Sequence, residues 1–537
     1  MLRALSVVAA MHVVRAAVEC TDPVEYPYLP TFHVLNNVSV MPNGGLHVEP
    51  LNDINAIFFY RGLYHVMCQA GGGNWTHAVS SDLSRWFRIQ DALGTGAPNS
   101  SWDRDGPCDG TLSFPGDGNG PLILYGADCA DKSLGLGDFP RVGRARAADP
   151  ADPYLRDWIK GPENATFVGD PASFPGKVWR SEDGSHWNVL GALRGESPWA
   201  RYTAAVTDDS MLNWTLADAS FTKPTGIKIA AAAGDLFNPL PGAVPGGPTH
   251  MISSGTGNTF YLGNYDARLE QFNITSDLQY IDEGYSANEF FGDGPHWAAT
   301  SNDFSTEPRV LWASWIQHAP SMISLTRSLT YDSRAETLVS FPVAEVAALR
   351  NETFMDHAFL ALPPGAQVAL PVPAVAGGAL DLLASFVIPP GAVAGVGLAA
   401  RAPATGPAGA AAWISFNVSA ADARGVRNVT ASGSVGPKPP SSEAPYKTCA
   451  LYPGETLDVR LLVDRPVHEI FVNGGRISWA FADNANPFHT ANASVWVFNH
   501  GAVMLNASSV SAFGMGCGWA DELPAPRASS DESRQSH

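Results

Sequence analysis

The sequence predicts an all-β protein with at least two domains. The chain has 537 residues, which is more than a single hydrophobic core usually supports. Gly (52 residues) and Pro (42 residues) are abundant, whereas charged residues make up only 16% of the chain, and this balance favours short strands and turns over long surface helices. Aromatic-rich runs alternate with clusters of Gly, Asp, Asn and Pro, a spacing typical of propellers and sandwiches.

Residues 45–345 are predicted to form many short antiparallel strands, arranged either as a propeller or as a sandwich. The clearest strands are apolar runs bounded by turn residues: Pro121–Tyr125, Trp187–Leu190, Thr259–Leu262 and Val310–Ile316. Helical periodicity is scarce, and one short helix is expected at Val343–Arg350.

A change of composition marks a second domain. Residues 363–410 are rich in Ala, Pro, Gly and Val and carry almost no charge. The runs around and after them alternate with turns and predict a separate β-sandwich: Leu380–Ile388, Ala412–Phe416, Leu457–Val463, Val467–Val472 and Ser494–Phe498. We place the first domain at residues 30–350, the sandwich at 360–520, a loop at 434–446 and a polar, disordered tail at 524–537.

The charge of the chain limits its partners. The formal net charge is −19 and the pI is near 5.1, which argues against nucleic acid or an anionic membrane surface and suits a neutral substrate. After the first residues, no segment is long and apolar enough to span a bilayer.

The N-terminus and the glycosylation motifs predict the secretory pathway. Residues 1–19 resemble a signal peptide, with an early Arg, an apolar run and small residues. The chain is therefore expected to be an extracellular or vacuolar glycoprotein. Asn-x-Ser/Thr sequons occur at Asn37, Asn74, Asn99, Asn164, Asn213, Asn273, Asn351, Asn417, Asn428, Asn492 and Asn506.

The six cysteines do not form a zinc motif, because none belongs to a C-x-x-C pair. In an oxidising compartment Cys108–Cys129 and Cys449–Cys517 are plausible disulfides, although sequence leaves the connectivity open. Cys68 lies in an apolar run and is expected to be a buried thiol.

No metal or other cofactor is expected from the sequence. The histidines nearest the polar segment described next, His47, His65 and His77, lack metal-ligand spacing, and we interpret them as structural.

The stretch His47–Gln69 combines a predicted hairpin with a polar segment. Ala56–Tyr60 and Leu63–Met67 read as two strands joined by two residues, as in a tight hairpin. Asn52-Asp53-Ile54-Asn55 precedes the first strand, and a carboxylate held there by rigid strands can point into a pocket. The alternative is a turn or cap, since Asn and Asp bond their own backbone in turns.

This stretch resembles the sucrose-binding signature of glycoside hydrolase family 32, the invertases and fructan hydrolases. Asn52, Asp53 and Asn55 match the family's W-M-N-D-P-N-G, with Ile54 and Ala56 in place of Pro and Gly. The residues that match Y-K-G-x-Y-H-L-F-Y-Q are Tyr60, Gly62, Tyr64, His65 and Gln69.

Further segments resemble the motifs of the same family in the same order. They are Asn74–Trp86, Trp102–Thr111 (at W-S-G-S), Phe167–Pro171 (at F-R-D-P), Thr259–Asp266, Val310–Ile316, Phe341–Val346 and Val463–Arg476. The resemblance implies a five-bladed β-propeller followed by a C-terminal β-sandwich. It also implies a retaining glycosidase that acts on β-fructofuranosides such as sucrose or fructans.

The resemblance assigns roles to individual residues. Asp53 is expected to be the nucleophile, and Asp170 to stabilise the transition state through the sugar hydroxyls. Asn52 and Gln69 are candidates for hydrogen bonds to hydroxyls, Trp75 for stacking on a sugar face, and Asp109 for a substrate contact. The alternatives are core packing for Trp75 and turn roles for the other residues, since Asp and Asn are common in turns.

The general acid is the point at which the chain departs from the family. Members supply a Glu from E-C-P-D-[LF]-F, and here the corresponding stretch is Ala232–Phe237, with Ala232 at the Glu position and Asp235 at the Asp position. Gly169 also stands where the family has an Arg before Asp170.

Three interpretations of this departure are open. In the first, Asp235 or another carboxylate serves as the acid, with Glu196 as the best-placed alternative; Asp235 is otherwise a structural residue that holds the pocket. In the second, the enzyme works slowly or on a good leaving group, because general acid catalysis contributes roughly 10²–10⁴-fold. In the third, the protein is a catalytically degenerate carbohydrate binder. An arabinanase-like propeller hydrolase is a further alternative, which the match at Val463–Arg476 disfavours.

Overall fold

The computed structural model is built almost entirely of strands, with short 3₁₀ helices and no long helix among the residues that it describes. None of the helices in this part of the chain could cross a membrane. The structure describes residues 29–36, 38–40, 46–71, 73–96, 103, 106–114, 120–127, 142–161, 166–168, 178–192, 199–207, 211–225, 237–253, 259–280, 288–291, 309–316, 321–373, 378–389, 394–401, 410–435, 447–482 and 494–527.

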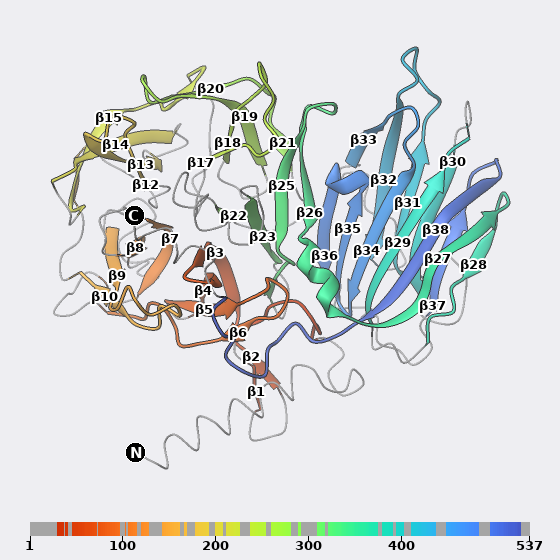
Figure 1. Cartoon of the computed structure of the whole chain (residues 1–537), viewed down its shortest axis with the longest axis horizontal. Coiled ribbons are helices and arrows are strands. Elements are labelled where there is room, and N and C mark those ends of the chain that lie inside the picture. Colours follow the sequence, from red (N-terminus) through yellow and green to blue (C-terminus); the bar gives the residue numbers. More distant parts are fainter. Residues whose placement is uncertain are drawn as a thin grey trace, which may run out of the picture.

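The first domain consists of sheets arranged around a common centre (Figure 1). The first two sheets are β3 (Leu51–Tyr60), β4 (Leu63–Ala70), β5 (Asn74–Ser80) and β6 (Phe87–Arg88), then β7 (Pro107–Ser113), β8 (Leu122–Ala127), β9 (Val142–Ala147) and β10 (Trp158–Lys160). A separate ribbon of β1 (Val38–Val40) and β2 (Leu46–Val48) precedes them.

Three further sheets continue the arrangement, and two of them end in a strand that pairs in parallel. The third holds β11 (Thr166–Val168), β12 (Val178–Arg180), β13 (His186–Ala192), β14 (Trp199–Ala205) and β15 (Asn213–Asp218). The fourth holds β16 (Thr222–Lys223), β17 (Phe237–Pro239), β18 (His250–Ser253), β19 (Thr259–Asp266), β20 (Gln271–Ile274) and β21 (Gln279–Tyr280). The fifth holds β22 (Asn288–Phe291), β23 (Val310–Ile316), β24 (Met322–Ile323), β25 (Arg327–Asp332) and β26 (Thr337–Pro342).

The innermost strands of these sheets contact one another around the centre of the domain. Strand β3 lies against both β7 and β22, β7 also contacts β12, and β17 contacts β22. At these four junctions, neighbouring sheets thus meet through strands at the end of each sheet, as the blades of a β-propeller do. Five such sheets lie within the described residues, and a total of five blades stays a prediction.

The second domain is a β-sandwich of two six-stranded sheets, drawn from green to blue in Figure 1. One sheet holds β27 (Arg350–Leu362), β38 (Leu505–Met515), β29 (Ala379–Val387), β34 (Leu457–Asp464), β35 (Val467–Val472) and β36 (Ile477–Ala482). The other holds β28 (Gln367–Ala369), β37 (Ser494–Asn499), β30 (Ala394–Arg401), β31 (Ala410–Val418), β32 (Arg427–Val435) and β33 (Lys447–Leu451). Alternate side chains from both sheets fill the core between them.

The prediction of a propeller followed by a sandwich is confirmed, and each quoted strand has a counterpart in the structure. The short helix expected at Val343–Arg350 is present as the 3₁₀ helix η2 (Ala344–Leu349). Strand β27 joins the sandwich sheet from Arg350, earlier than the expected start at residue 360, and the domain limits stay predictions.

Two sequence-based expectations are wrong. Pro524–Arg527 is not a free tail, because the Arg527 amide donates to the Gly62 carbonyl and Pro524 accepts from the Tyr154 hydroxyl. Cys449 and Cys517 do not pair. Cys449 is a free thiol in the sandwich core. Cys517 is disulfide-bonded and packs against the other hydrophobic core, which contains residues of both the propeller and the sandwich.

The cysteine of β4 agrees with its prediction, since Cys68 is a buried free thiol. Cys108 is disulfide-bonded, while Cys129, its expected partner, lies outside the described residues, as does the predicted signal peptide.

A buried charge cluster joins the N-terminal segment, the propeller and the sandwich. His33 contacts Asp464 through Nδ1 (2.8 Å) and Glu469 through Nε2 (2.9 Å). Glu469 also pairs with Arg327 of β25 at 2.8 Å, and all four side chains are 0% exposed. Asp464 accepts further bonds from the backbone amides of residues 31–33, so the sandwich holds the N-terminal segment in place.

The cluster shifts the pKa values of His33 and Glu469. Burial alone would lower the pKa of His33, but its hydrogen bonds to Asp464 and Glu469 raise this pKa from 6.5 to about 9. Burial alone would raise the pKa of Glu469, but the charges of Arg327 and His33 lower it from 4.5 to about 2. The His33 imidazolium and the Glu469 carboxylate therefore stabilise each other when both are ionised.

We expect the stability of the protein to depend on the protonation of His33. Because its folded pKa of about 9 exceeds the unfolded value of 6.5, its contribution is complete below pH 6.5 and is lost as the pH rises through 9. The contribution is on the order of 3 kcal/mol, at about 1.4 kcal/mol per pKa unit. Urea denaturation between pH 6 and pH 9.5, compared between wild type and His33→Gln, measures it.

The matched control is His357→Gln, because the His357 side chain is 80% exposed. The wild-type protein and this control should lose stability in parallel as the pH rises, whereas His33→Gln should start lower and lose less. Equal slopes for all three proteins would contradict the assignment.

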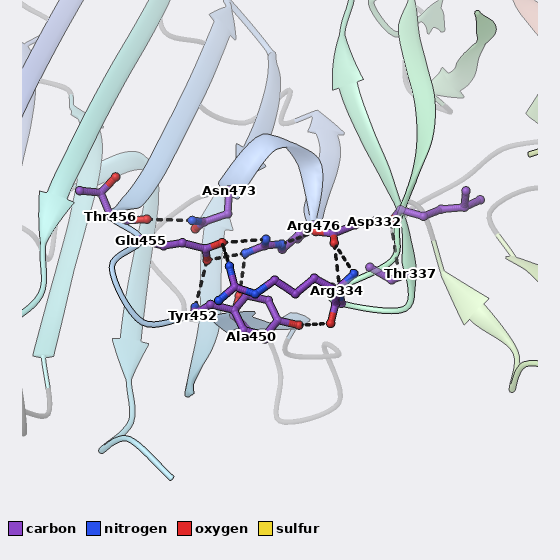
Figure 2. A network of polar contacts seen from close by, with 11 residues as sticks. Asp332, Arg334, Thr337, Ala450, Tyr452, Glu455, Thr456, Asn473 and Arg476 are labelled. Carbon is purple, nitrogen blue, oxygen red and sulfur yellow. Dashed lines mark hydrogen bonds and ion pairs between the residues drawn. The ribbon is translucent and has the colours of Figure 1, made fainter. Parts of the chain in front are cut away.

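A second polar network links the β25–β26 hairpin to the sandwich (Figure 2). The Arg476 guanidinium donates to Asp332 at 2.8 Å and to Glu455 at 2.7 and 3.0 Å. Arg334 pairs with Glu455 at 3.3 Å and lies over the Tyr452 ring, 3.8 Å from its centroid. Hydrogen bonds to Glu455 raise the pKa of Arg476 above its already high usual value, although partial burial opposes this shift. Arg476 is therefore always charged.

Removal of Arg476 should destabilise the junction between the two domains. Arg476→Met leaves Asp332 and Glu455 as neighbouring carboxylates, only 19% and 24% exposed, without their shared cation. We expect a loss of roughly 2 kcal/mol, because hydrogen bonds to charged groups contribute about 1.5–3 kcal/mol. Calorimetry of this variant against Arg424→Met, whose ion pair is 82% exposed at the arginine, measures the difference. A similar small effect in both variants would show that the network adds nothing.

Candidate active site

The β3–β4 hairpin carries the polar segment of the sequence. Its turn residues, Arg61 and Gly62, both have positive φ (46° and 86°), as a two-residue turn that matches strand twist requires. Strand β3 starts at Leu51, so Asn52 and Asp53 lie inside the strand and their interpretation as a turn or cap is wrong. The pairing of β3 with β4 is irregular between Leu51 and Ala56, and such bulges redirect side chains next to active sites.

The exposure pattern of the inner strands distinguishes four polar side chains. In β4 every residue except Gln69 is buried, and in β7 every residue except Asp109 is buried. Asn52 and Asp53 are half-buried at the start of β3, whereas residues 54–59 after them are fully buried. The two blades that contain β3–β4 and β7 therefore direct these polar side chains toward one site that is partly accessible to solvent.

These four side chains contact one another. With its amide nitrogen facing the carboxylates, Gln69 donates to Asp109 Oδ1 at 3.0 Å and to Asp53 Oδ2 at 3.3 Å. The Asn52 amide lies 3.2 Å from the same end of Gln69. Asp53 and Asp109 are also hydrogen-bonded directly to each other. The structure thus brings together Asn52, Asp53, Gln69 and Asp109, as the sequence-based assignment to one site requires.

The two carboxyl groups share a proton. Burial, repulsion by Asp53 and a hydrogen bond to Asp53 raise the pKa of Asp109 well above its usual value. Two carboxylates in contact cannot both ionise at neutral pH, so one member of such a pair keeps its proton. The raised pKa indicates that Asp109 is the member of the pair that holds a proton and donates it to Asp53.

Buried neighbours hold Asp109 in position. Trp75 is 0% exposed, and its indole N–H donates to the Cys108 carbonyl at 2.6 Å. Trp75 therefore packs beneath β7 in this structure and does not present a face for a sugar to stack on. A Cβ on Gly110 would lie 2.2 Å from the Leu124 carbonyl oxygen, so the residue after Asp109 has no room for a side chain.

Asn55 is a supporting residue that our sequence analysis did not assign to the site. It is 1% exposed, and its Oδ1 accepts from the Gly110 amide at 3.3 Å, which ties β3 to β7 next to the carboxyl pair. Its match to the last Asn of the family signature was the signal available in the sequence. Asp109 lies within β7, so its alternative interpretation as a turn residue is wrong.

The remaining predicted catalytic residues, Asp170 and Asp235, lie outside the described residues. Strand β11 ends at Val168, just before Asp170, and the inner strand β17 begins at Phe237, just after Asp235. Gly169, Ala232 and Glu196 also lie outside the described part of the chain. Their roles stay predictions.

The neighbouring histidines are structural. His65 Nδ1 and His77 Nε2 lie 2.9 Å apart, both rings are fully buried, and Phe58 stacks on His65 at 4.7 Å. Burial lowers the pKa of His65 to about 3 and that of His77 well below 6.5, so both rings are neutral at physiological pH. One ring then donates and the other accepts, which links β4 to β5 in the core.

Comparison with known sequences places this site in a family. Residues 47–342, more than half of the chain, match the model described as the glycosyl hydrolases family 32 N-terminal domain. A fructan 6-exohydrolase of Beta vulgaris is 24% identical over 62% of this chain and 56% of its own length. An insoluble β-fructofuranosidase of Arabidopsis thaliana, isoenzyme CWINV4, is 27% identical over 59% of this chain and 58% of its own length. The matched part thus spans little more than half the length of these relatives.

Solved structures share the fold over nearly the whole chain. Fructan 1-exohydrolase IIa from Cichorium intybus superposes with a TM-score of 0.70 and 20% identity, over 92% of this chain and 98% of its own. A Bombyx mori β-fructofuranosidase of the same family superposes with a TM-score of 0.61 and 16% identity, over 97% and 100% of the two chains. The sequence match includes the hairpin with Asp53, β7 with Asp109 and the five propeller sheets that lie within the described residues. The chain belongs to glycoside hydrolase family 32.

Proposed function

We propose that the protein is a retaining glycoside hydrolase of the β-fructofuranosidase type, which hydrolyses sucrose or fructans with Asp53 as nucleophile. The observation that carries the proposal is the half-buried Asp53–Asp109 pair on two inner strands of the propeller, within the region that matches the family. A carboxylate that attacks an anomeric carbon has to be ionised, and the proton held by Asp109 leaves Asp53 in that form.

The relatives support this substrate class. Those we compared are named fructan 1- or 6-exohydrolases and β-fructofuranosidases, and one solved neighbour is a fructan 1-exohydrolase in complex with 1-kestose. A small neutral sugar also suits a chain with a net charge of −19. The substrate is therefore proposed as a terminal β-fructofuranosyl unit on glucose or on another fructose.

Each polar residue of the site has a proposed task. Asn52 and Gln69 bind sugar hydroxyls beside Asp53, and Gln69 also orients the two carboxyl groups through its amide. Asp170, by resemblance to the family motif, stabilises the charge that develops on the sugar ring. The attack of Asp53 on the anomeric carbon forms a covalent fructosyl-enzyme, and water then releases fructose with the original anomeric configuration.

We also propose that the protein follows the secretory pathway. Six sequon asparagines of the described residues are exposed, which leaves them accessible to glycosylation: Asn213, Asn273, Asn351, Asn417, Asn428 and Asn506. The disulfide bonds of Cys108 and Cys517 also fit an oxidising compartment.

The function is tested by glucose and fructose release from sucrose, 1-kestose, inulin and levan. We expect the purified wild-type protein to release fructose from at least one of these, and Asp53→Asn to lose the activity by several orders of magnitude with its circular dichroism unchanged. The amide cannot form the covalent intermediate. The configuration of the first product, followed by NMR, should be the β form.

Asp157→Asn, at an exposed carboxylate far from Asp53 in the sequence, serves as the control and should keep the wild-type rate. Full activity of Asp53→Asn would exclude its role as nucleophile. Sugar binding by calorimetry without turnover in the wild-type protein would indicate instead the carbohydrate-binding alternative that lacks catalysis.

A further inference from the structure

The proposed reaction needs a proton donor, and the family's usual donor has no counterpart in the sequence. Ala232 stands at the position of the acid Glu in the E-C-P-D-[LF]-F segment. An unassisted departure of a sugar alkoxide is slow, because general acid catalysis contributes roughly 10²–10⁴-fold. A second carboxyl group near Asp53 would supply what the Ala232 position cannot.

We propose that Asp109 is this proton donor, so that the chain has moved its general acid from the Ala232 segment to strand β7. The inference rests on the proposed function, since it assigns a role in the same reaction. Asp109-Gly110-Thr111 falls on the S-G-S of the family segment W-S-G-S, so a carboxyl group occupies a position where the family has a hydroxyl.

The geometry places Asp109 beside the nucleophile on a different blade. Asp53 lies on β3 and Asp109 on β7, which are inner strands in direct contact. Their side chains are hydrogen-bonded to each other, and the Gln69 amide reaches both within 3.3 Å. Asp109 is also the only residue of β7 that is not buried, so its carboxyl group faces the same accessible place as Asp53.

Neighbouring residues hold the backbone of Asp109, whereas its carboxyl group is bonded to residues of the site. Trp75 holds the carbonyl of the preceding Cys108, Asn55 holds the amide of the following Gly110, and Gly110 itself lies against Leu124. The bonds described for the Asp109 carboxyl group go to Asp53 and Gln69, both of which belong to the site. A substrate that takes over these bonds can therefore reorient the side chain without disturbing β7.

The environment keeps a proton on Asp109 in the absence of substrate. Burial and the adjacent Asp53 carboxylate raise the pKa of Asp109 well above its usual value. In the free protein, Asp109 thus carries the proton that it has to donate, and it is hydrogen-bonded to the nucleophile Asp53.

The first chemical step follows from this arrangement. The glycosidic oxygen replaces Asp53 as the acceptor of the Asp109 proton, and the carboxyl groups separate toward the roughly 5–5.5 Å that retaining enzymes use. An Asp53 oxygen bonds to the anomeric carbon, the bond from that carbon to the glycosidic oxygen breaks, and the Asp109 proton moves to the departing oxygen. For sucrose the products are free glucose, a fructosyl ester of Asp53 and an ionised Asp109.

The second step restores both residues. Ionised Asp109 accepts a proton from water as the water oxygen bonds to the anomeric carbon and the ester bond to Asp53 breaks. Fructose leaves, and the proton returns to the Asp53–Asp109 pair. One water is consumed per glycosidic bond, and no oxidant, reductant or metal takes part in this cycle.

A proton donor and a residue that merely orients Asp53 predict different responses to the leaving group. We would measure kcat and KM of wild type, Asp109→Asn and Asp109→Ser on sucrose and on a nitrophenyl β-fructofuranoside, whose phenolate departs without a proton. Asp109→Ser restores the hydroxyl that the family has at this position. Asp157→Asn is again the control, and Asp53→Asn reports on the nucleophile.

If Asp109 is the acid, both of its variants should lose about 10²–10⁴-fold in kcat on sucrose. On the nitrophenyl substrate they should release a burst of nitrophenolate, because only the second step is then slow, and azide should accelerate turnover by attacking the fructosyl ester. Asp53→Asn should be inactive on both substrates and show no burst.

Equal losses on both substrates, without a burst, would overturn the proposal and leave Asp109 as a positioning residue that acts through Asp53. Unchanged activity on sucrose would overturn it as well. If the wild-type protein hydrolysed neither substrate and released no fructose from 1-kestose, inulin or levan, the proposed function itself would fail. That result is distinct because it does not depend on Asp109.

Discussion

The buried charge cluster of His33, Arg327, Asp464 and Glu469 holds the N-terminal segment, the propeller and the sandwich together. Charges that are fully removed from water are tolerated only when each is paired and hydrogen-bonded. Here the four partners come from three parts of the chain, namely the N-terminal segment, β25 of the propeller and β34–β35 of the sandwich. Any displacement of one part would leave a buried charge without its partner, so the cluster fixes the relative position of all three.

The hydrophobic core around this cluster is continuous from the propeller into the sandwich. Arg327 lies between the rings of Trp312 and Phe471, 4.9 Å from each centroid, which joins a propeller strand to a sandwich strand. The segment after β38 returns to the first blade, where the Trp86 amide donates to the Gly518 carbonyl (Figure 1). The segment that follows the sandwich thus contacts the blade that carries Asp53, and it reaches the β3–β4 hairpin itself through the bond from the Arg527 amide to the Gly62 carbonyl.

The site itself follows from a bulge and a close approach of two inner strands. The irregular register at the start of β3 directs Asn52 and Asp53 away from the buried face that the rest of the strand has. A small residue, Gly110, lets β7 approach Leu124 and Trp75, and this packing sets Asp109 beside Asp53. Two carboxyl groups thus meet in a half-buried place, where partial burial and their mutual repulsion shift pKa values as they do at catalytic sites.

The fold class, the strand positions and the family resemblance could all be predicted from the sequence. Strand runs, turn residues and hairpin chemistry are local properties, so Val310–Ile316 and Val467–Val472 agree with β23 and β35 residue for residue. Asp53 was also identifiable, because its motif is contiguous in the chain. By contrast, three features are visible only in the folded protein. They are the pairing of Asp53 with Asp109, the burial of Trp75 and the separation of Cys449 from Cys517. These features depend on which blades and sheets become neighbours, and residue spacing along the chain carries no direct record of that proximity.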